Sequence, residues 1–267
     1  METEKVPFIV GRGVLPKRGK MILGGQPKTN KSFVVLNMAI SMALGQPLFK
    51  ATYKSGTPVL PVTGPCKILY IEAELGPDGL QGRLRNIVAD LNPAALEMFV
   101  TTRDTAMRLD TPEGFERIKA EVGEVRPDVL IIDPMAKFHL QDENSAQEMG
   151  YVMRMVDHLV EDFGCAVILV HHLKKPNEDH PARGGDRLRG SSAVFADVDT
   201  VVELERLSDE NVKEPILKMN FEMRRGEPLE SLFFKRLLSG AVVYMGEEFR
   251  WGSKTQSPHP RSKFSHA

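Results

Sequence analysis

The segment Gly25 to Ser32 combines residue types that can hold a phosphate chain. Its sequence, GQPKTNKS, matches G-x-x-x-x-G-K-[ST] except that Asn30 stands at the second glycine. The motif needs backbone N–H groups turned towards phosphate oxygens at the start of a helix. The replaced glycine often has positive φ, and asparagine tolerates that region better than most residues. A glycine-rich turn before an ordinary helix is the alternative for this segment taken alone.

The motif assigns a role to each part of a nucleotide-binding loop. Lys31 would reach the β- and γ-phosphates, and the Ser32 hydroxyl would bind Mg²⁺. The strand and the long apolar helix expected on either side of the loop favour nucleotide binding. The predicted ATP-binding residues of this loop are Gly25, Gln26, Pro27, Lys28, Thr29, Asn30, Lys31, Ser32 and Phe33.

A carboxylate follows a fully apolar run about a hundred residues downstream of this loop. Val129 to Ile132 is the run, and Asp133 stands at its end. A carboxylate in that place can hold Mg²⁺ through a water molecule, so Ser32 and Asp133 are the predicted metal-side pair. A turn or helix cap after a core strand is the alternative for Asp133 alone.

Hydrolysis also needs a group that orients or deprotonates the attacking water. Pro134 follows Asp133 directly, so no glutamate is adjacent to it. Glu72 and Glu74 stand at the end of the run KILYIE, and both are candidates. We favour Glu74 because it lies at the edge of the expected loop, where the alternative is a solvated carboxylate.

Two histidines, His171 and His172, end another apolar run. A polar residue here can contact the γ-phosphate, whereas a buried, hydrogen-bonded pair is the alternative. No further ligand stands at metal-site spacing. The following segment, 173–190, is net basic, which predicts a contact with nucleic acid. The alternative is a solvated lid over the nucleotide site. The predicted nucleic-acid-binding residues are Lys174, Lys175, Arg183, Arg187 and Arg189.

These residues need a scaffold that brings strand ends together. Apolar runs at Lys20 to Leu23, Lys67 to Glu72, Val129 to Ile132 and Ala166 to Val170 alternate with helical patterns, which we place at 32–44, 77–91, from Thr111 and Pro112 onwards, and at 145–163. Fully apolar strands alternating with helices predict an α/β fold with a mostly parallel sheet covered on both faces. Ligands bind such sheets at the carboxyl ends of the strands.

The pattern changes after residue 200. Short apolar runs, at Val201 to Leu204, Ile216 to Phe221, Leu232 to Phe234 and Ala241 to Tyr244, are separated by turn residues. They predict an antiparallel C-terminal extension of the sheet. Residues 252–267 are polar and rich in Pro and Ser, which predicts a disordered tail after one ATPase domain spanning 1–251.

Composition excludes several classes of protein. The 267 residues carry 35 Lys and Arg against 36 Asp and Glu, which argues against a nucleic-acid binder that is basic over its whole surface. The two cysteines, Cys66 and Cys165, fit no zinc spacing and are expected as buried thiols in a reducing cytoplasm. No apolar run approaches the roughly 20 residues of a membrane span, so we expect a cytoplasmic protein without a membrane partner.

The chain resembles the RecA-fold hexameric helicases over most of its length. The resemblance is greatest to plasmid RepA-type replicative helicase ATPases and more distant to DnaB-like helicases. It rests on the stretches GGQPKTNKS, ILYIEAEL, VLIIDP, VHHLKK and RLRGSSA. It implies a RecA-like P-loop NTPase fold that binds ATP and Mg²⁺ between the subunits of a ring, a homo-hexamer acting on single-stranded DNA.

The resemblance also implies roles for single residues. Glu74 falls at the position of the catalytic glutamate, and His172 falls at the γ-phosphate sensor. Arg224 falls near the arginine finger that DnaB-like enzymes supply to the neighbouring subunit, with Arg225 as the alternative.

Three functions follow from these patterns. The first is an ATP-driven helicase or replication motor that translocates on single-stranded DNA as a ring. The second is a RecA-like recombination or loading factor that uses ATP to switch its affinity for DNA and forms an open filament. The third is a nucleotide-gated regulator without DNA contact. The chain has no N-K-x-D guanine motif, so ATP is favoured over GTP.

Overall fold

The computed structural model describes residues 7–89, 96–102, 105–173 and 192–251. Within these ranges, most strands belong to one nine-stranded sheet. The strands, in spatial order, are β11 (Val242–Tyr244), β10 (Leu232–Arg236), β9 (Ile216–Met223), β8 (Thr200–Arg206), β3 (Lys20–Gly25), β7 (Ala166–His172), β6 (Val129–Asp133), β4 (Ile68–Glu72) and β5 (Met98–Thr102).

The sheet has a parallel part and an antiparallel part. From β8 to β5 every neighbouring pair is parallel. The pairs β8–β9, β9–β10 and β10–β11 are antiparallel. This confirms the predicted α/β fold of the RecA-like P-loop NTPase type, with a mostly parallel sheet and an antiparallel C-terminal extension.

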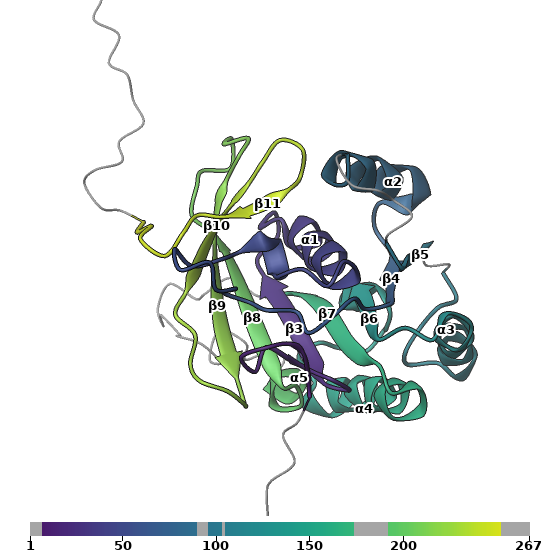
Figure 1. Cartoon of the computed structure of the whole chain (residues 1–267). Coiled ribbons are helices and arrows are strands. Elements are labelled where there is room, and N and C mark those ends of the chain that lie inside the picture. Colours follow the sequence, from purple (N-terminus) through teal and green to yellow (C-terminus); the bar gives the residue numbers. More distant parts are fainter. Residues whose placement is uncertain (1–6, 90–95, 103–104, 174–191, 252–267) are drawn as a thin grey trace, which may run out of the picture.

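Helices cover both faces of the parallel part (Figure 1). One face carries α1 (Lys31–Ala43) and α2 (Gly76–Ile87). The other carries α3 (Pro112–Val125), α4 (Ala146–Phe163) and α5 (Ser192–Ala196). Successive residues of β3 serve the two cores, because side chains alternate along a strand: Met21 and Leu23 pack on the α1 side, and Ile22 packs on the α4 side.

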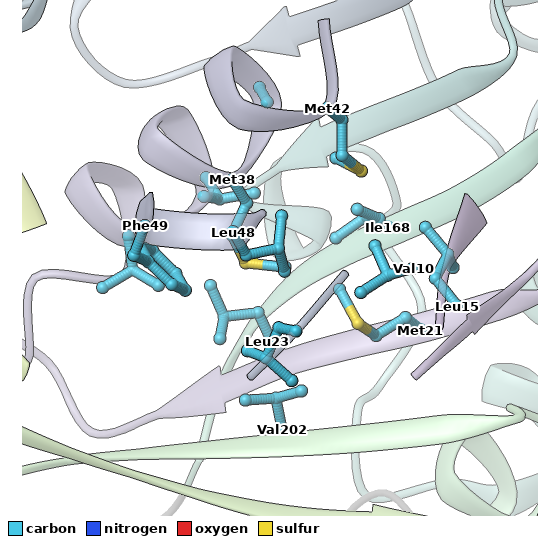
Figure 2. Close-up of a cluster of buried hydrophobic side chains, with 14 of the residues drawn as sticks. Val10, Leu15, Met21, Leu23, Met38, Met42, Leu48, Phe49, Ile168 and Val202 are labelled. Carbon is cyan, nitrogen blue, oxygen red and sulfur yellow. The ribbon is translucent and has the colours of Figure 1, made fainter. Parts of the chain in front are cut away.

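The core beside α1 holds the element that begins at the phosphate loop. In Figure 2, α1 and the 3₁₀ turn η1 (Leu48–Lys50) face the central strands, and the labelled side chains are Val10, Leu15, Met21, Leu23, Met38, Met42, Leu48, Phe49, Ile168 and Val202. α1 is buried along most of its length, including its first residue, Lys31. The nucleotide-loop helix is therefore a rigid part of the core.

The helix boundaries follow local signals. Thr111 caps α3, where its Oγ1 accepts a hydrogen bond from the Gly114 N–H, and Pro112 is the first helical residue, as predicted. Ser145 caps α4 in the same way. The helix predicted at 77–91 is shorter than expected and ends at Ile87. Since α2 fully buries only Leu80, little packing energy is available to extend it.

A small hairpin near the N-terminus was not predicted. β1 (Phe8–Val10) and β2 (Leu15–Pro16) are joined by a turn in which Arg12 has φ 60° and Gly13 has φ 93°. Strands this short carry too few residues for an alternating pattern to be visible. The predicted tail, 252–267, lies outside the described residues. Among the residues that the structure describes, no helix is long and apolar enough to cross a membrane.

Candidate active site

The carboxyl ends of β3, β4, β6 and β7 lie along one edge of the sheet. Register places Gly25 beside His172 and Glu72 beside Asp133. A pocket opens at this edge, and it is lined by Lys28, Thr29, Asn30, Lys31, Ser32, Phe33, Glu74, Leu75, Arg83, Asp133, His172 and Arg206. The structure thus brings together most of the residues that were predicted for ATP and Mg²⁺.

The backbone of the phosphate loop has left-handed residues at two non-glycine positions. Asn30 has φ 69° and ψ 28°, and Lys28 has φ 65°. Asparagine therefore takes the backbone conformation that was expected where the motif has glycine. Gly25 is needed for a different reason: a Cβ there would lie 2.7 Å from Thr29 Oγ1 and 2.8 Å from the Leu204 carbonyl oxygen.

The loop also borders a second hollow, on the side of β8. Gln26 and Pro27 line it together with Lys28 and Thr29. The opposite wall is formed by β8 and the turn that follows it, from Glu203 to Glu210. Lys28 Nζ lies 3.0 Å from Glu210 Oε2, so the loop and this turn are in contact. Gln26 and Pro27, although predicted with the loop, are not among the residues that line the first pocket.

Lys31 lies buried at the bottom of the pocket. Its ammonium group donates to the carbonyl oxygens of Gly25 at 2.9 Å and Gln26 at 3.0 Å. It also lies 3.1 Å from His172 Nδ1. Burial lowers the pKa of Lys31 to about 8, although Asp133 and Glu74 act in the opposite direction. A triphosphate would favour the charged form of this amine.

Asp133 is 3% exposed and has two hydroxyl groups beside it. The Tyr70 hydroxyl donates a hydrogen bond to Asp133 Oδ2, and the Ser32 hydroxyl lies near enough to this carboxylate to lower its pKa. Burial raises the pKa of Asp133, while the two hydroxyl groups lower it. Tyr70 was missed by the sequence analysis because an aromatic residue inside an apolar strand is usually core packing.

The donors at this place suit Mg²⁺. The Ser32 hydroxyl and the Asp133 carboxylate are hard oxygen ligands, which Mg²⁺ prefers. Across the described part of the chain, no group of three or more His, Cys, Asp or Glu side chains could hold a metal ion. A magnesium ion here would therefore take its remaining ligands from water and phosphate oxygens, as is usual for nucleotide-bound Mg²⁺.

The two glutamates after β4 occupy different environments. Glu72 is 2% exposed, and its carboxylate accepts hydrogen bonds from the backbone N–H groups of Glu74, Leu75 and Gly76. Glu72 therefore shapes the loop that leads into α2. Glu74 is exposed and lines the pocket. Of the two candidates, only Glu74 can contact a water molecule in the pocket.

The two histidines after β7 point to different neighbours. His172 lines the pocket, and burial together with the nearby Lys31 charge lowers its pKa. His171 is 1% exposed, and its ring meets Phe195 of α5 edge-on at 6.4 Å between centroids. Burial lowers the pKa of His171 to about 4, so this ring is neutral at physiological pH.

Arginines near the mouth of the pocket were missed by the sequence analysis. Arg83 of α2 and Arg206 at the end of β8 line it. Two guanidinium groups contact the Phe33 ring, with Arg83 Cζ at 4.4 Å and Arg236 Cζ at 5.0 Å from its centroid. No sequence pattern marks these arginines, because their elements meet only in the folded chain.

The predicted finger residues lie at the other end of the sheet. Arg224 follows β9, whose last residue, Met223, pairs with Thr200 at the start of β8. Thr200 in turn pairs with Met21, near the start of β3, four residues before Gly25. At about 3.3 Å per residue, Met21 lies roughly 13 Å along β3 from Gly25 of the phosphate loop. Arg224 and Arg225 are therefore not part of the pocket of their own chain.

The predicted nucleic-acid-binding residues, Lys174, Lys175, Arg183, Arg187 and Arg189, lie outside the described residues. The described chain stops at Leu173, which is tied to the phosphate loop. Its N–H donates to the Gly25 carbonyl at 3.1 Å, and its side chain would meet a Cβ on Gly24 at 2.9 Å. The basic segment therefore begins directly beside the pocket.

Comparison with known families agrees with this geometry. A family model described as the AAA domain matches residues 2–178, which is more than half of the chain. The matched range contains the phosphate loop, Glu74, Asp133 and His172. Match and fold together show a nucleotide-hydrolysing P-loop ATPase, of a type that generally uses ATP with Mg²⁺.

Proposed function

Because this chain belongs to the AAA domain family, we propose that its ATPase drives movement along single-stranded DNA, as a helicase or replication motor that acts as a homo-hexameric ring. One observation carries the proposal. His172 Nδ1 lies 3.1 Å from Lys31 Nζ, at the end of the pocket expected to hold the γ-phosphate. The next residue, Leu173, donates its N–H to the Gly25 carbonyl and is the first residue of the basic segment.

The binding step uses the residues around the phosphate loop. Lys31 contacts the β- and γ-phosphates, and the loop N–H groups surround the phosphate chain. Ser32 and Asp133 would hold a magnesium ion, and Tyr70 orients the Asp133 carboxylate. Phe33, which contacts Arg83 and Arg236, lines the pocket at the start of α1. A magnesium ion bound there would supply charge neutralisation to the phosphate chain.

The hydrolytic step uses Glu74 and His172. The Glu74 carboxylate orients a water molecule and takes its proton as the water oxygen attacks the γ-phosphorus. The bond from phosphorus to the β,γ-bridging oxygen breaks, and ADP leaves with those electrons. His172, beside Lys31, contacts the γ-phosphate and changes partner when the phosphate is released. Leu173 follows directly, so this change is passed to the segment 174–190.

The ring would add an arginine from a neighbouring subunit to the pocket. Arg224 lies away from its own pocket, so we assign it to the pocket of the neighbouring subunit, with Arg225 as the alternative. A guanidinium group from a neighbour stabilises charge on the transferring phosphoryl group. ATP hydrolysis would then depend on assembly of the ring.

The test is ATP hydrolysis measured with and without single-stranded DNA, with Lys31→Ala as the blank. A motor predicts strong stimulation by DNA that is absent in the blank. Charge reversal of Lys174, Lys175 and Arg183 should remove the stimulation and leave the DNA-free rate unchanged, whereas Lys213→Glu, on an exposed turn, should change neither. Hydrolysis indifferent to DNA would overturn the motor and favour a nucleotide-gated regulator. Stimulation without strand separation would favour an ATP-switched loading factor.

A further inference from the structure

Two turns from opposite ends of the chain are packed backbone to backbone. The first is the turn between β1 and β2, residues 11–14, and the second is residues 224–227 after β9. A Cβ on Gly13 would lie 2.1 Å from the Arg225 carbonyl oxygen, and a Cβ on Gly226 would lie 2.3 Å from the Arg12 carbonyl oxygen. Both glycines have φ near 90°. Only glycine at both positions allows this contact, so the relative position of the two turns is tightly defined.

These two turns, which are in backbone contact, carry three arginines. Arg12, Arg224 and Arg225 are all exposed. The Arg12 guanidinium donates to the Tyr53 hydroxyl at 2.6 Å, and the Arg224 N–H donates to the Asp199 carbonyl at 2.9 Å. The backbone of Arg12 has φ 60°, a value that residues other than glycine rarely adopt. The fold therefore holds Arg12 in an unfavourable backbone conformation, in the turn that packs against residues 224–227.

We propose that Arg12 belongs to the same intersubunit phosphate site as Arg224, so that the triphosphate bound by a second copy of this chain is contacted by two arginines from two interlocked turns. The inference rests on the proposed function, because it needs a neighbour whose pocket faces this end of the sheet. It adds Arg12 as a catalytic residue acting in trans, and Tyr53 as a positioning residue that directs its guanidinium group.

The charge pattern around these turns favours a compact anion over an extended one. Asp199 lies 3.8 Å from Arg225, and Glu227 is exposed in the same turn. These carboxylates interrupt the continuous row of cations that a long phosphodiester chain needs. A terminal phosphate group needs no such row, because two or three guanidinium groups are enough to bind its oxygens.

Variants can remove each guanidinium group without disturbing the turn. Arg12→Asn suits the left-handed backbone, since asparagine tolerates positive φ. We expect it to lower ATP hydrolysis by roughly 10²-fold, the size typical of one lost transition-state donor. Tyr53→Phe should give a smaller loss, with kcat reduced and KM for ATP little changed. Lys17→Ala, at an exposed lysine on the same N-terminal segment, is the matched control and should hydrolyse ATP normally.

Mixing experiments separate action in trans from action in cis. Arg12→Asn has an intact phosphate loop, whereas Lys31→Ala has intact arginines. Equimolar mixing of these two inactive proteins should restore part of the activity, because some pockets then combine a working loop with a neighbour's Arg12. Mixing Arg224→Ala with Lys31→Ala tests the proposed finger in the same way.

The outcomes distinguish the two levels of the proposal. Restoration with Arg224→Ala but not with Arg12→Asn, while Arg12→Asn alone is inactive, overturns the role of Arg12 and leaves the finger in place. Restoration with neither variant overturns the intersubunit site altogether. An Arg12→Asn protein with a normal DNA-free rate but weaker single-stranded DNA binding overturns the proposal in favour of a nucleic-acid contact.

Discussion

Glu72 and Glu74 stand two residues apart, and their environments differ because one ends a buried strand and the other begins an open loop. Glu72 accepts three backbone hydrogen bonds at 2% exposure. Glu74 faces the pocket that contains Lys31 and Asp133. At the scale of single residues, the glutamate proposed for catalysis and the glutamate that stabilises the loop are thus only two residues apart.

The two glutamates should respond differently to substitution. Glu74→Gln should lower kcat by about 10²–10⁴-fold and leave ATP binding nearly intact, since it removes a base without removing a phosphate contact. Glu72→Ala should instead lower the free energy of unfolding by about 1–3 kcal/mol, because three partly buried N–H groups lose their acceptor. Steady-state kinetics and thermal unfolding of both variants check this pair. A Glu72→Ala protein of normal stability and no activity would contradict it.

Lys31 should make nucleotide binding dependent on pH. Burial lowers its pKa to about 8, so the amine of the free protein loses its charge above that pH. A triphosphate favours the charged amine, and binding above pH 8 therefore takes up a proton. Affinity should then fall as pH rises, by up to about tenfold per unit. Calorimetry in buffers of different ionisation enthalpy measures the uptake.

Lys31→Arg is the control for this pH dependence, because a guanidinium group stays charged throughout the range. Its affinity for Mg-ATP should be independent of pH between about 8 and 10. Absence of proton uptake in the unsubstituted protein at pH 9 would contradict the assignment of this dependence to Lys31.

At the scale of elements, Asn37 joins the phosphate-loop helix to the end of the sheet. Its Nδ2 donates to the carbonyls of Phe33 at 2.8 Å and Gly240 at 3.0 Å, and its Oδ1 accepts from the Val242 N–H at 3.1 Å. The turn between β10 and β11 is thereby held against α1. This turn also packs on Phe33, since a Cβ on Gly240 would lie 2.8 Å from the ring.

Replacing Asn37 should loosen this join. Asn37→Ala leaves the buried Gly240 carbonyl and Val242 N–H without their partner, which should cost about 2–4 kcal/mol of stability. Denaturant unfolding measures it, with Asn86→Ala on the exposed side of α2 as a control expected to change stability by less than about 0.5 kcal/mol. Equal stability of the two variants would show that Asn37 does not join these elements.

At the scale of the whole molecule, the contact between Gly13 and Gly226 ties the N-terminal hairpin to the antiparallel extension. Gly226→Ala combines a positive φ with a clash against the Arg12 carbonyl, and it should cost about 3 kcal/mol or more. Gly246→Ala is the matched control, because Gly246 has φ 89° and nothing within 4 Å of a Cβ. It should cost only about 1 kcal/mol. Similar losses in the two variants would argue against the close contact.

Much of the fold follows from local patterns. The buried runs of β4, β6 and β7 are apolar along almost their whole length, so their parallel, doubly covered sheet was predictable. The starts of α3 and α4 follow from Thr111 and Ser145, whose side chains cap the helix directly. Asn30 also belongs here, since its tolerance of positive φ is a property of the residue itself.

The sequence by itself determined the kinds of chemistry available to this protein: a phosphate loop, a metal-side carboxylate, two glutamates, two histidines and a basic segment. Only the tertiary structure decided that Glu74 rather than Glu72 faces the pocket, that Tyr70 holds Asp133, and that the turn containing Arg12 packs against the turn containing Arg225. The physical reason is distance along the chain. Motifs and caps depend on neighbouring residues, whereas these placements depend on strand register and on turns that meet across some two hundred residues.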